Sequence, residues 1–376
     1  MRPGGYRSWM EISRKRLAEN FQAVRELVGP AVEVAPVVKA DAYGHGAVEI
    51  SRVLESAGAR WLAVSSVEEG VALRQAGITA RILVMADFLP AERQALFEFD
   101  LTPAIHSLED IAVLERMAAE YQQSFPFHLK LDTGMGRLGT LAEPDQILAA
   151  LGGLRWVRLE GLMTHFASAA RQTSDQTAQQ IERFGRILAV LEAAGVRPQY
   201  RHLASTIPVA YGRREAWGNM VRPGQAIYGY ISPLQGASRK PLLQVQPVMQ
   251  WRATFLEIKA VPEGMLIGYG GMFRAPRPMR IGILAVGYAD GYPHRLSNRG
   301  RVIVNGRYAP VVGAVSMDLT TVDVTDISPV RPGDCATLIG VEGEASIDAQ
   351  EIARLAGTIS YAVLCGISAR VKRVYL

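Results

Sequence analysis

The sequence predicts an α/β protein with an N-terminal (β/α)8 TIM barrel followed by a mostly β C-terminal domain. From residue 13 to about residue 230, amphipathic helical patterns alternate with short β-branched apolar runs, as in repeated βα units. These apolar runs number eight, as a barrel requires. After about Leu242 the pattern changes to alternating strands. We therefore expect the two domains to span residues 10–241 and 242–376.

The barrel elements follow from the spacing of the apolar residues. Strands are expected at 32–39, 61–65, 82–86, 101–105, 127–132, 159–165, 200–205 and 220–230. Apolar residues three or four apart predict helices, of which 13–28 and 174–194 are the clearest. A doubly wound open sheet is the alternative, because periodicity alone does not close a barrel.

The C-terminal third is expected to form a separate sheet-rich domain. Its strands are expected at 248–260, 279–286, 301–304, 308–312, 319–324 and 335–339. Asn305-Gly306, between the third and fourth of these, indicates a type I′ hairpin. One helix over 347–356 precedes a last segment, 371–376.

Composition and charge argue against several classes of function. The 376 residues, 49% of them hydrophobic, are enough for about two well-packed domains. The net charge of +5 comes from 41 basic and 36 acidic residues without a Lys/Arg block, which argues against nucleic-acid binding. Cys335 and Cys365 are too few for a disulfide framework and are not spaced for zinc, so no metal site is expected. Residues 1–9 hold no signal peptide or membrane span, so a cytoplasmic protein is expected.

Lys39 is the most informative residue for function. It ends the apolar run 34–38 and precedes a turn that contains Tyr43, Gly44 and Gly46. An ammonium group there is costly unless it is paired or neutral, whereas a Schiff base to an aldehyde leaves a working imine nitrogen. We therefore interpret Lys39 as a cofactor-binding lysine. The alternative is a strand-end lysine whose charged group reaches solvent.

Other polar residues fall at the ends of the expected strands, where barrel enzymes place their active-site residues. They are Lys130 and Arg137 near the fifth strand, His165 at the end of the sixth, Ser205 and Thr206 at the end of the seventh, and Arg222 and Gly224 in the eighth. The hydroxyl pair and Gly224 can offer hydroxyls and a backbone N–H to a phosphate. The alternative for the hydroxyl pair is a turn before Ile207-Pro208.

Three segments carry a resemblance to a known family. Segments 37–46, 129–139 and 221–224 are similar to motifs of the alanine racemases, and the similarity extends over residues 9–376. The resemblance implies pyridoxal 5'-phosphate bound through Lys39, in a barrel that is followed by a β domain.

The resemblance also assigns further residues to the cofactor. The phosphate would be held by Tyr43, Thr206, Gly224, Gln225 and Tyr361, with Ser205 and His165 also among the cofactor-binding residues. Two positions depart from the family, which more often has Asn-Ser in place of Ser205-Thr206 and an aliphatic residue in place of Gln225.

Arg222 is the match with the clearest mechanistic meaning. In the family the equivalent arginine faces the pyridine nitrogen of the cofactor. Because a guanidinium is always charged and has no proton to spare, that nitrogen stays unprotonated and the ring becomes a weaker electron sink. Rapid proton return is then favoured over transamination and decarboxylation. The alternative is an arginine in a structural ion pair.

Racemisation needs two proton-transfer groups on opposite faces of the planar Cα, because one base alone would return the proton mainly to the face it left. Lys39 would be one group, and the resemblance makes Tyr269 the other. A phenol that acts as a base needs cationic or hydrogen-bonding neighbours, which His165 and then Arg222 would supply. The alternatives are a surface β-turn tyrosine and a structural barrel histidine.

The resemblance assigns the remaining site residues to the substrate. Arg137 would bind the substrate carboxylate through its bidentate fork, with help from the backbone amide of Met317. Lys130 points from its strand toward Arg137, and two adjacent cations repel each other unless something negative lies between them. In many members of the family this lysine is carbamylated, so the resemblance implies the same for Lys130. The alternative is a lysine turned outward by strand alternation. Tyr288 would narrow the entry channel.

The family also implies a quaternary structure and a pathway. Each active site is completed across a homodimer, so that Lys39 of one subunit works with Tyr269 of the other. The first residues, 1–9, can pair with the second domain. The product would supply D-alanine for peptidoglycan.

Other functions on this scaffold remain open as alternatives. A serine or broad-specificity racemase would differ in a few pocket residues, and the narrow pocket expected near Tyr269, Tyr288 and Tyr361 favours alanine. A fold-type III decarboxylase would need a protonated pyridine nitrogen, which Arg222 argues against. A non-racemising pyridoxal-phosphate-binding barrel protein would not need Tyr269 and would usually lack the second domain.

Overall fold

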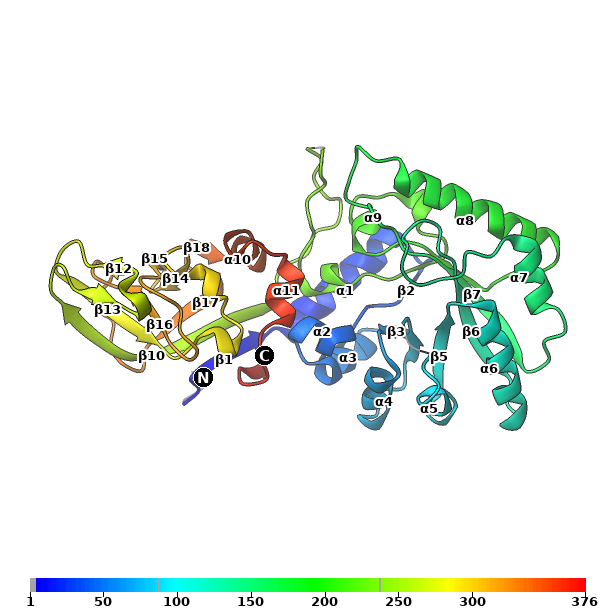
Figure 1. The fold of residues 1–376 in the computed structure, drawn as a ribbon, viewed down its shortest axis with the longest axis horizontal. Helices are drawn as coiled ribbons and strands as arrows, with labels where there is room; N and C mark the ends of the chain where they lie inside the picture. The colour runs from blue at the N-terminus through cyan, green and yellow to red at the C-terminus, as the bar shows by residue number, and fades with distance from the viewer. Residues whose placement is uncertain (1–4, 87, 237) are drawn as a thin grey trace. The chain divides into compact units, whose positions relative to one another are not determined.

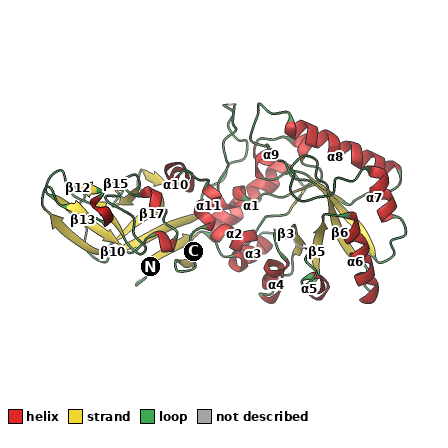
Figure 2. Cartoon of the chain, in the orientation of Figure 1, coloured by secondary structure: helices red, strands yellow, loops and turns green. Residues whose placement is uncertain are grey.

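The chain forms two compact units. A computed structural model describes residues 5–86, 88–236 and 238–376. The barrel unit consists of Leu17–Ala42 and Ala47–Gln246, and the β unit consists of Met1–Arg16, Tyr43–Gly46 and Pro247–Leu376. The elements of each unit are labelled in Figure 1, and Figure 2 distinguishes helices from strands by colour. The exact domain boundary expected at 241–242 stays a prediction.

In the described part of the chain, eight parallel strands form the barrel. They are β2 (Glu33–Val34), β3 (Trp61–Val64), β4 (Arg81–Val84), β5 (Leu101–Ile105), β6 (Phe125–Lys130), β7 (Val157–Met163), β8 (Tyr200–His202) and β9 (Met220–Val221). Strands β3 to β8 pair in sequence order, and β2 pairs with β9. A bridge between Val37 and Ala63 links the chain after β2 to β3. The N–H of Asn219 donates to the carbonyl of Arg201 (3.0 Å), which links β9 to β8. Backbone contacts therefore complete the circuit, so the predicted barrel is confirmed and the open sheet is excluded.

Helices accompany the strands of the barrel. They are α1 (Arg14–Val28), α3 (Ala47–Ser56), α4 (Val67–Gln75), α5 (Arg93–Glu98), α6 (Leu108–Glu120), α7 (Pro144–Leu151), α8 (Gln176–Ala193) and α9 (Thr206–Ala210), with short 3-10 turns η1 (Arg214–Ala216) and η2 (Gln225–Tyr228). Ser66 and Glu69 form a capping box at α4, and Ser107 caps α6. The helices expected over 13–28 and 174–194 are present as α1 and α8.

The chain after β2 differs from the strand expected over 32–39. Pro36 has no N–H to give to a sheet, and regular pairing stops before it. A short helix, α2 (Lys39–Gly44), follows instead. From Ala40 to Tyr43 the φ angles lie between 51° and 54°, which is the left-handed region. Each such residue costs roughly 1–2 kcal/mol, so the turn after the lysine must be held by contacts elsewhere.

Two carboxylates of the barrel unit hold this turn. Glu69 accepts the N–H of Ala40 (2.6 Å) and the N–H of Ser65 (2.7 Å). Asp41 accepts the N–H of Ala47, at the start of α3, over 2.7 Å. The strained backbone that carries Lys39 is thereby tied to the starts of α3 and α4.

The β unit is built around one long strand. Its strands are β1 (Ser8–Ile12), β10 (Met249–Val261), β11 (Leu266–Ile267), β12 (Phe273–Arg274), β13 (Met279–Leu284), β14 (Arg301–Val304), β15 (Arg307–Pro310), β16 (Thr320–Asp323), β17 (Cys335–Glu342), β18 (Ala345–Ile347) and β19 (Lys372–Tyr375). Its helical segments are η3 (Tyr269–Gly271), η4 (Tyr288–Asp290), η5 (His294–Leu296), α10 (Ala349–Ala356) and α11 (Ser360–Cys365). Strand β10 pairs with β1, β13 and β17. Asn305 and Gly306 have φ of 52° and 73°, as a type I′ hairpin between β14 and β15 requires.

Both chain ends contribute to the sheet of the β unit. Strand β1 pairs antiparallel with β10 and parallel with β19. Ser8 and Trp9, from the segment 1–9 that was expected to pair with this domain, lie in β1. Residues 1–4 lie outside the described residues. The buried indole of Trp251 on β10 donates to the Ser8 hydroxyl over 2.7 Å, which fixes β1 on the core.

Candidate active site

Cationic side chains gather around His165 in the barrel unit. Burial, followed by the charges of Arg222, Lys130, Arg137 and Lys39, lowers the pKa of His165 to about 3. The imidazole is therefore neutral at physiological pH. Lys130 ends β6 and the other four residues follow β2, β6, β7 and β9, so the barrel brings together five side chains that the sequence singled out. A concentration of positive charge like this is suited to anionic ligands.

Lys130 ends β6 and is only 6% exposed, which removes the alternative of a lysine turned outward to solvent. Burial, together with the charges of Arg222 and Arg137, lowers the pKa of Lys130 to about 8. A substantial fraction of this amine is therefore neutral, and hence nucleophilic, near pH 8.

The loop after β6 is organised by one carboxylate. Asp132 accepts the N–H groups of Gly134 (3.0 Å), Met135 (2.8 Å), Gly136 (3.1 Å) and Arg137 (3.1 Å). Burial alone would raise the pKa of Asp132, but these N–H groups lower it. The carboxylate is thus committed to the loop backbone and fixes the main chain of Arg137, whose side chain is exposed.

The hydroxyl pair predicted to meet a phosphate begins a short helix. Ser205 is the N-cap of α9, but its side chain makes no capping hydrogen bond. The Thr206 hydroxyl accepts the N–H groups of Gly224 (3.2 Å) and Ala226 (3.3 Å), which ties the ends of β8 and β9 together. Gln225 is buried and accepts a hydrogen bond from the Ser232 hydroxyl (3.1 Å). The strand expected over 220–230 ends early, because Pro-Gly follows β9 and η2 begins.

Arg222 is 2% exposed and held rigidly. Its Nη1 donates to His202 Nδ1 (2.7 Å) and to the His202 carbonyl (2.8 Å), and its Nη2 donates to the carbonyl of Thr164 (2.7 Å). These acceptors are an imidazole and carbonyls, so the structure does not support the alternative of an ion pair. Burial lowers the pKa of Arg222 to about 10, which leaves it cationic at neutral pH. His202 was missed from the sequence, although it lies in the strand expected over 200–205.

The other predicted site residues lie in the β unit, three of them in neighbouring loops with exposed side chains. Tyr269 in η3 is 78% exposed, Tyr288 in η4 is 46% exposed, and Met317 is 53% exposed. The N–H of Tyr288 donates to the carbonyl of Ser316 (3.0 Å), and the N–H of Ala289 donates to that of Met317 (3.0 Å).

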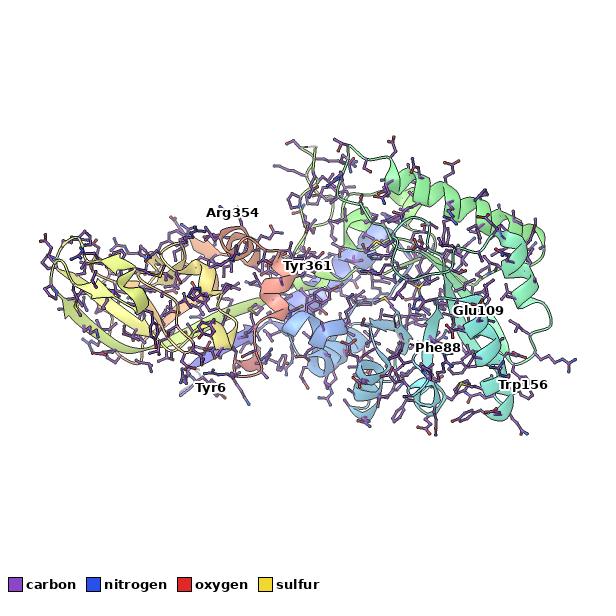
Figure 3. All side chains as sticks on the ribbon, in the orientation of Figure 1. Tyr6, Phe88, Glu109, Trp156, Arg354 and Tyr361 are labelled. Carbon is purple, nitrogen blue, oxygen red and sulfur yellow. The ribbon has the colours of Figure 1, made fainter. Side chains whose placement is uncertain are left out.

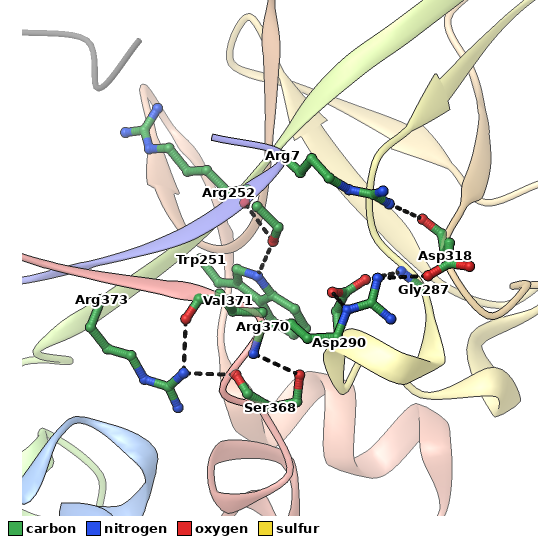
Figure 4. A network of polar contacts seen from close by, with 11 residues as sticks. Arg7, Trp251, Arg252, Gly287, Asp290, Asp318, Ser368, Arg370, Val371 and Arg373 are labelled. Carbon is green, nitrogen blue, oxygen red and sulfur yellow. Dashed lines mark hydrogen bonds and ion pairs between the residues drawn. The ribbon is translucent and has the colours of Figure 1, made fainter. Parts of the chain in front are cut away.

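An ionic network fixes two of these loops (Figure 4). Arg370 contacts the Asp318 carboxylate (2.6 Å) and the buried Asp290 carboxylate (3.4 Å). Asp290 in turn accepts the N–H of Gly287 (2.9 Å). A Cβ on Gly287 would lie 2.3 Å from the carbonyl oxygen of Met317, so only glycine permits this close approach of the two loops.

Tyr43 and Tyr361 lie together in the β unit. Their ring centroids are 5.9 Å apart. Burial, followed by the neighbouring Tyr361, raises the pKa of Tyr43, so its phenol remains a hydrogen-bond donor. Arg373 donates to the carbonyl of Gly44 (3.1 Å), which anchors the segment after Tyr43 to the C-terminal strand. Figure 3 shows Tyr361 on α11.

The residues of the barrel unit fit an anionic aldehyde cofactor. A lysine follows the first strand, this lysine and three other cations act on His165, and hydroxyl and backbone groups lie at the ends of β8 and β9. Within residues 5–86, 88–236 and 238–376, no group of three His, Cys, Asp or Glu side chains is placed to hold a metal ion. No helix among the described residues is long and apolar enough to cross a membrane. Fold and site together define a barrel enzyme of the pyridoxal-phosphate-dependent class.

Comparisons with known proteins identify the family. The family models "Alanine racemase, N-terminal domain" and "Alanine racemase, C-terminal domain" match residues 12–233 and 248–375. An alanine racemase of Halothermothrix orenii is 40% identical over 369 residues, which cover 98% of this chain and 96% of the relative. The chain belongs to the alanine racemase family, whose members depend on pyridoxal phosphate.

Solved structures agree with this assignment. The crystal structure of alanine racemase from D-cycloserine-producing Streptomyces lavendulae matches with a TM-score of 0.92 and 31% identity, over 99% of this chain and 97% of that one. The alanine racemase of Bartonella henselae, solved with covalently bound pyridoxal phosphate, matches with a TM-score of 0.87 and 26% identity, over 99% of this chain and all of that one (100%).

Proposed function

We propose that this protein interconverts L-alanine and D-alanine with bound pyridoxal 5'-phosphate, using Lys39 and Tyr269 as its two proton-transfer groups. The observation that carries the proposal is the cation cluster around neutral His165, together with the rigidly held, donor-only Arg222. When bound, the cofactor acidifies the α-proton of the amino acid by withdrawing electrons from Cα. Lys39 and Tyr269 would each hold or move that proton, on opposite faces.

Binding of cofactor and substrate would be divided among the other site residues. The phosphate would be held by Tyr43, Ser205, Thr206, Gly224, Gln225 and Tyr361. Arg137 and the Met317 amide would bind the substrate carboxylate. Arg222 would donate a hydrogen bond to the pyridine nitrogen. Because the guanidinium does not give up its proton, that nitrogen would stay unprotonated. His165 would lie beside the cofactor, and Tyr288 would narrow the entry channel.

The assay that tests this function follows both chirality and the α-hydrogen. Holoenzyme is incubated in D₂O with L-alanine, and separately with L-serine and L-lysine. Deuterated D-alanine that accumulates well ahead of the other products supports the proposal. Equal rates with serine or lysine would instead favour a broad-specificity racemase, and release of CO₂ would favour a decarboxylase.

A homodimer with shared active sites is our further proposal, and the exposure of the β-unit residues supports it. Tyr269 and Met317 are mostly exposed, and Leu266 and Met272 beside them expose large apolar side chains (52% and 54%). We infer that this surface completes the active site of a second copy, as a two-fold interface would allow.

Mixed dimers test the shared site. Lys39→Ala and Tyr269→Phe are each expected to be inactive alone. If sites are shared, a heterodimer has one site with both residues intact, so mixing and reassociating equal amounts should restore about one quarter of wild-type activity. If each site used residues of one subunit only, the mixture would stay inactive.

Lys130 is proposed to be carbamylated. The Nζ lone pair would bond to the carbon of CO₂, and Nζ would release a proton, which gives an anion between Lys130 and Arg137. Because the pKa of Lys130 is about 8, the reactive neutral amine predominates above pH 8 and is lost as the pH falls below it. Carbamate occupancy should therefore rise with pH and with bicarbonate, as measured by ¹³C NMR with ¹³C-bicarbonate. A Lys130→Arg variant with the same carbamate signal would contradict the assignment.

Cytoplasmic supply of D-alanine for peptidoglycan is the cellular role that we propose. A bacterial strain that cannot make D-alanine should grow without the supplement when it expresses this chain. Growth should fail with the Tyr269→Phe variant.

A further inference from the structure

We propose that Glu160, His128 and His202 form a buried chain that positions Arg222, the arginine proposed to meet the cofactor ring. This inference rests on the proposed function for its consequence, but its geometry lies wholly within the barrel unit. The three residues come from β7, β6 and β8, and they are 1%, 0% and 0% exposed.

The polarity of the chain is set at Arg222. A guanidinium has only donors, so His202 Nδ1, 2.7 Å from Arg222 Nη1, must accept and cannot carry a hydrogen. A neutral imidazole has one N–H, which then lies on His202 Nε2. Burial, followed by the charge of Arg222, lowers the pKa of His202 well below its ordinary value, in keeping with a neutral ring.

The next ring is fixed by the same argument. His202 Nε2 lies 2.8 Å from His128 Nδ1 and donates to it. His128 Nδ1 is therefore also bare, and its hydrogen lies on Nε2. A cationic His128 would need Nδ1–H, which would oppose the N–H of His202, so both rings must be neutral. His128 Nε2 lies 3.6 Å from the Glu160 carboxylate.

Glu160 ends the chain with a fixed negative charge. Arg81 contacts both of its oxygens, at 3.0 and 2.6 Å, and Arg158 contacts one at 3.0 Å. Burial alone would raise the pKa of Glu160, but His128 and Arg81 lower it to about 2. The carboxylate is therefore ionised at every pH at which the protein would be assayed.

The barrel is shaped to admit this chain. A Cβ on Gly161 would lie 2.5 Å from the ring of His128, so the residue after Glu160 must be glycine for the ring to fit. Trp61 also packs against His128, with ring centroids 5.5 Å apart, and Arg81 stacks over Trp61 at 4.0 Å. Tyr200 is the further titratable neighbour of His128, at 5.9 Å between ring centroids.

The chain has one consequence for catalysis. Through this chain Glu160 and the two imidazoles act on Nη1 of the guanidinium, while the carbonyls of Thr164 and Leu203 accept hydrogen bonds from Nη2. Arg222 is thus held in one orientation with its charge intact. Glu160, His128 and His202 are positioning residues, because they act on the reaction only through Arg222.

Histidine tautomers in the wild-type holoenzyme give a test that needs no variant and no activity. Long-range ¹H–¹⁵N NMR on histidine-labelled protein should show two rings in the Nε2–H form that do not titrate between about pH 5 and 9. Assignment would use His128→Gln and His202→Gln. An Nδ1–H tautomer on either ring, or titration of either ring in that range, would overturn the proposal. Absence of racemisation by the wild-type protein would instead overturn the proposed function.

A carboxylate variant tests the link to Arg222. Glu160→Gln should lower kcat about tenfold, because it removes the negative charge that lies 3.6 Å from His128 Nε2, with little change in KM for alanine. It should also shift the visible absorbance of the bound cofactor and raise the pyruvate formed per racemisation event. Glu115→Gln is the matched control, since Glu115 is a barrel glutamate whose hydrogen-bond donors, among the described residues, are the backbone N–H groups of residues 155–157. If both variants changed kcat, absorbance and pyruvate formation equally, Glu160 would have only a structural role and the proposal would be wrong.

Discussion

Tyr269→Phe is expected to lower the rate of racemisation by about 10²–10⁴-fold while the cofactor stays bound. The substitution removes only a phenolic hydroxyl, and the ring is 78% exposed in the β unit, so no core contact is lost. Stability should therefore change by no more than about 0.5 kcal/mol. Racemase activity, cofactor absorbance and thermal unfolding, measured on the same preparation, separate these effects.

Tyr308→Phe is the matched control for this variant. Tyr308 is also an exposed tyrosine of the β unit, but its hydroxyl donates to the carbonyl of Ser346 on a neighbouring strand. It should retain full activity. In D₂O the Tyr269→Phe variant should still exchange the α-proton of one alanine enantiomer, because Lys39 remains to serve one face. Undiminished racemisation would remove Tyr269 from the mechanism, and loss of all exchange would mean that it does more than serve as one base.

The sequence predicted the order of the elements better than their ends. Alternating helical and apolar patterns were sufficient for eight strands, since each strand and its helix are local. Closure of the barrel depends on the pairing of the first strand with the last, as in Val34 of β2 with Val221 of β9, and periodicity does not contain such distant pairs. The prediction of a closed barrel was therefore supported by the motif resemblance, because local patterns do not distinguish a barrel from an open sheet.

The turn after Lys39 shows the limit of local reasoning. Nothing in Ala40 or Ala42 favours a left-handed backbone, and a residue with a Cβ normally avoids it. The conformation is imposed by contacts that arise only in the folded chain, above all from Glu69 to the N–H of Ala40. Predictions from local backbone propensity are expected to fail at functional sites, where function can favour a strained conformation. The turn directly after the proposed cofactor lysine is such a place.

The sequence predicted charged residues of the candidate site but did not predict the residues that hold them in place. Arg222 and Lys130 were identified from their strand ends and motifs. His202 and His128 were not, because buried histidines have no local signature and these two are 74 residues apart in the sequence. These two histidines help to hold Arg222 in one orientation. The residues that support the charged groups of the site could therefore be identified only from the structure.

Lys39→Ala is expected to eliminate both racemisation and the visible absorbance of the covalent C=N link between the lysine and the cofactor. The loss has two physical sources, since Lys39 would be both the anchor of the cofactor and one of the two proton-transfer groups. The Lys39→Arg variant tests whether the positive charge alone is sufficient. It keeps a cation near His165 and Lys130 but cannot form the C=N link to the cofactor. If charge alone mattered, Lys39→Arg would retain the absorbance.

Added methylamine should restore a C=N absorbance in Lys39→Ala but little racemisation, because a small free amine forms the link without being held against one face of Cα. The exposed Lys259 on β10 offers a control, and Lys259→Ala should behave as wild type. Two results would contradict the assignment: full absorbance in Lys39→Ala without amine, which would place the link on another lysine, or wild-type racemisation after rescue. The second outcome would mean that the lysine anchors the cofactor while another residue moves the proton.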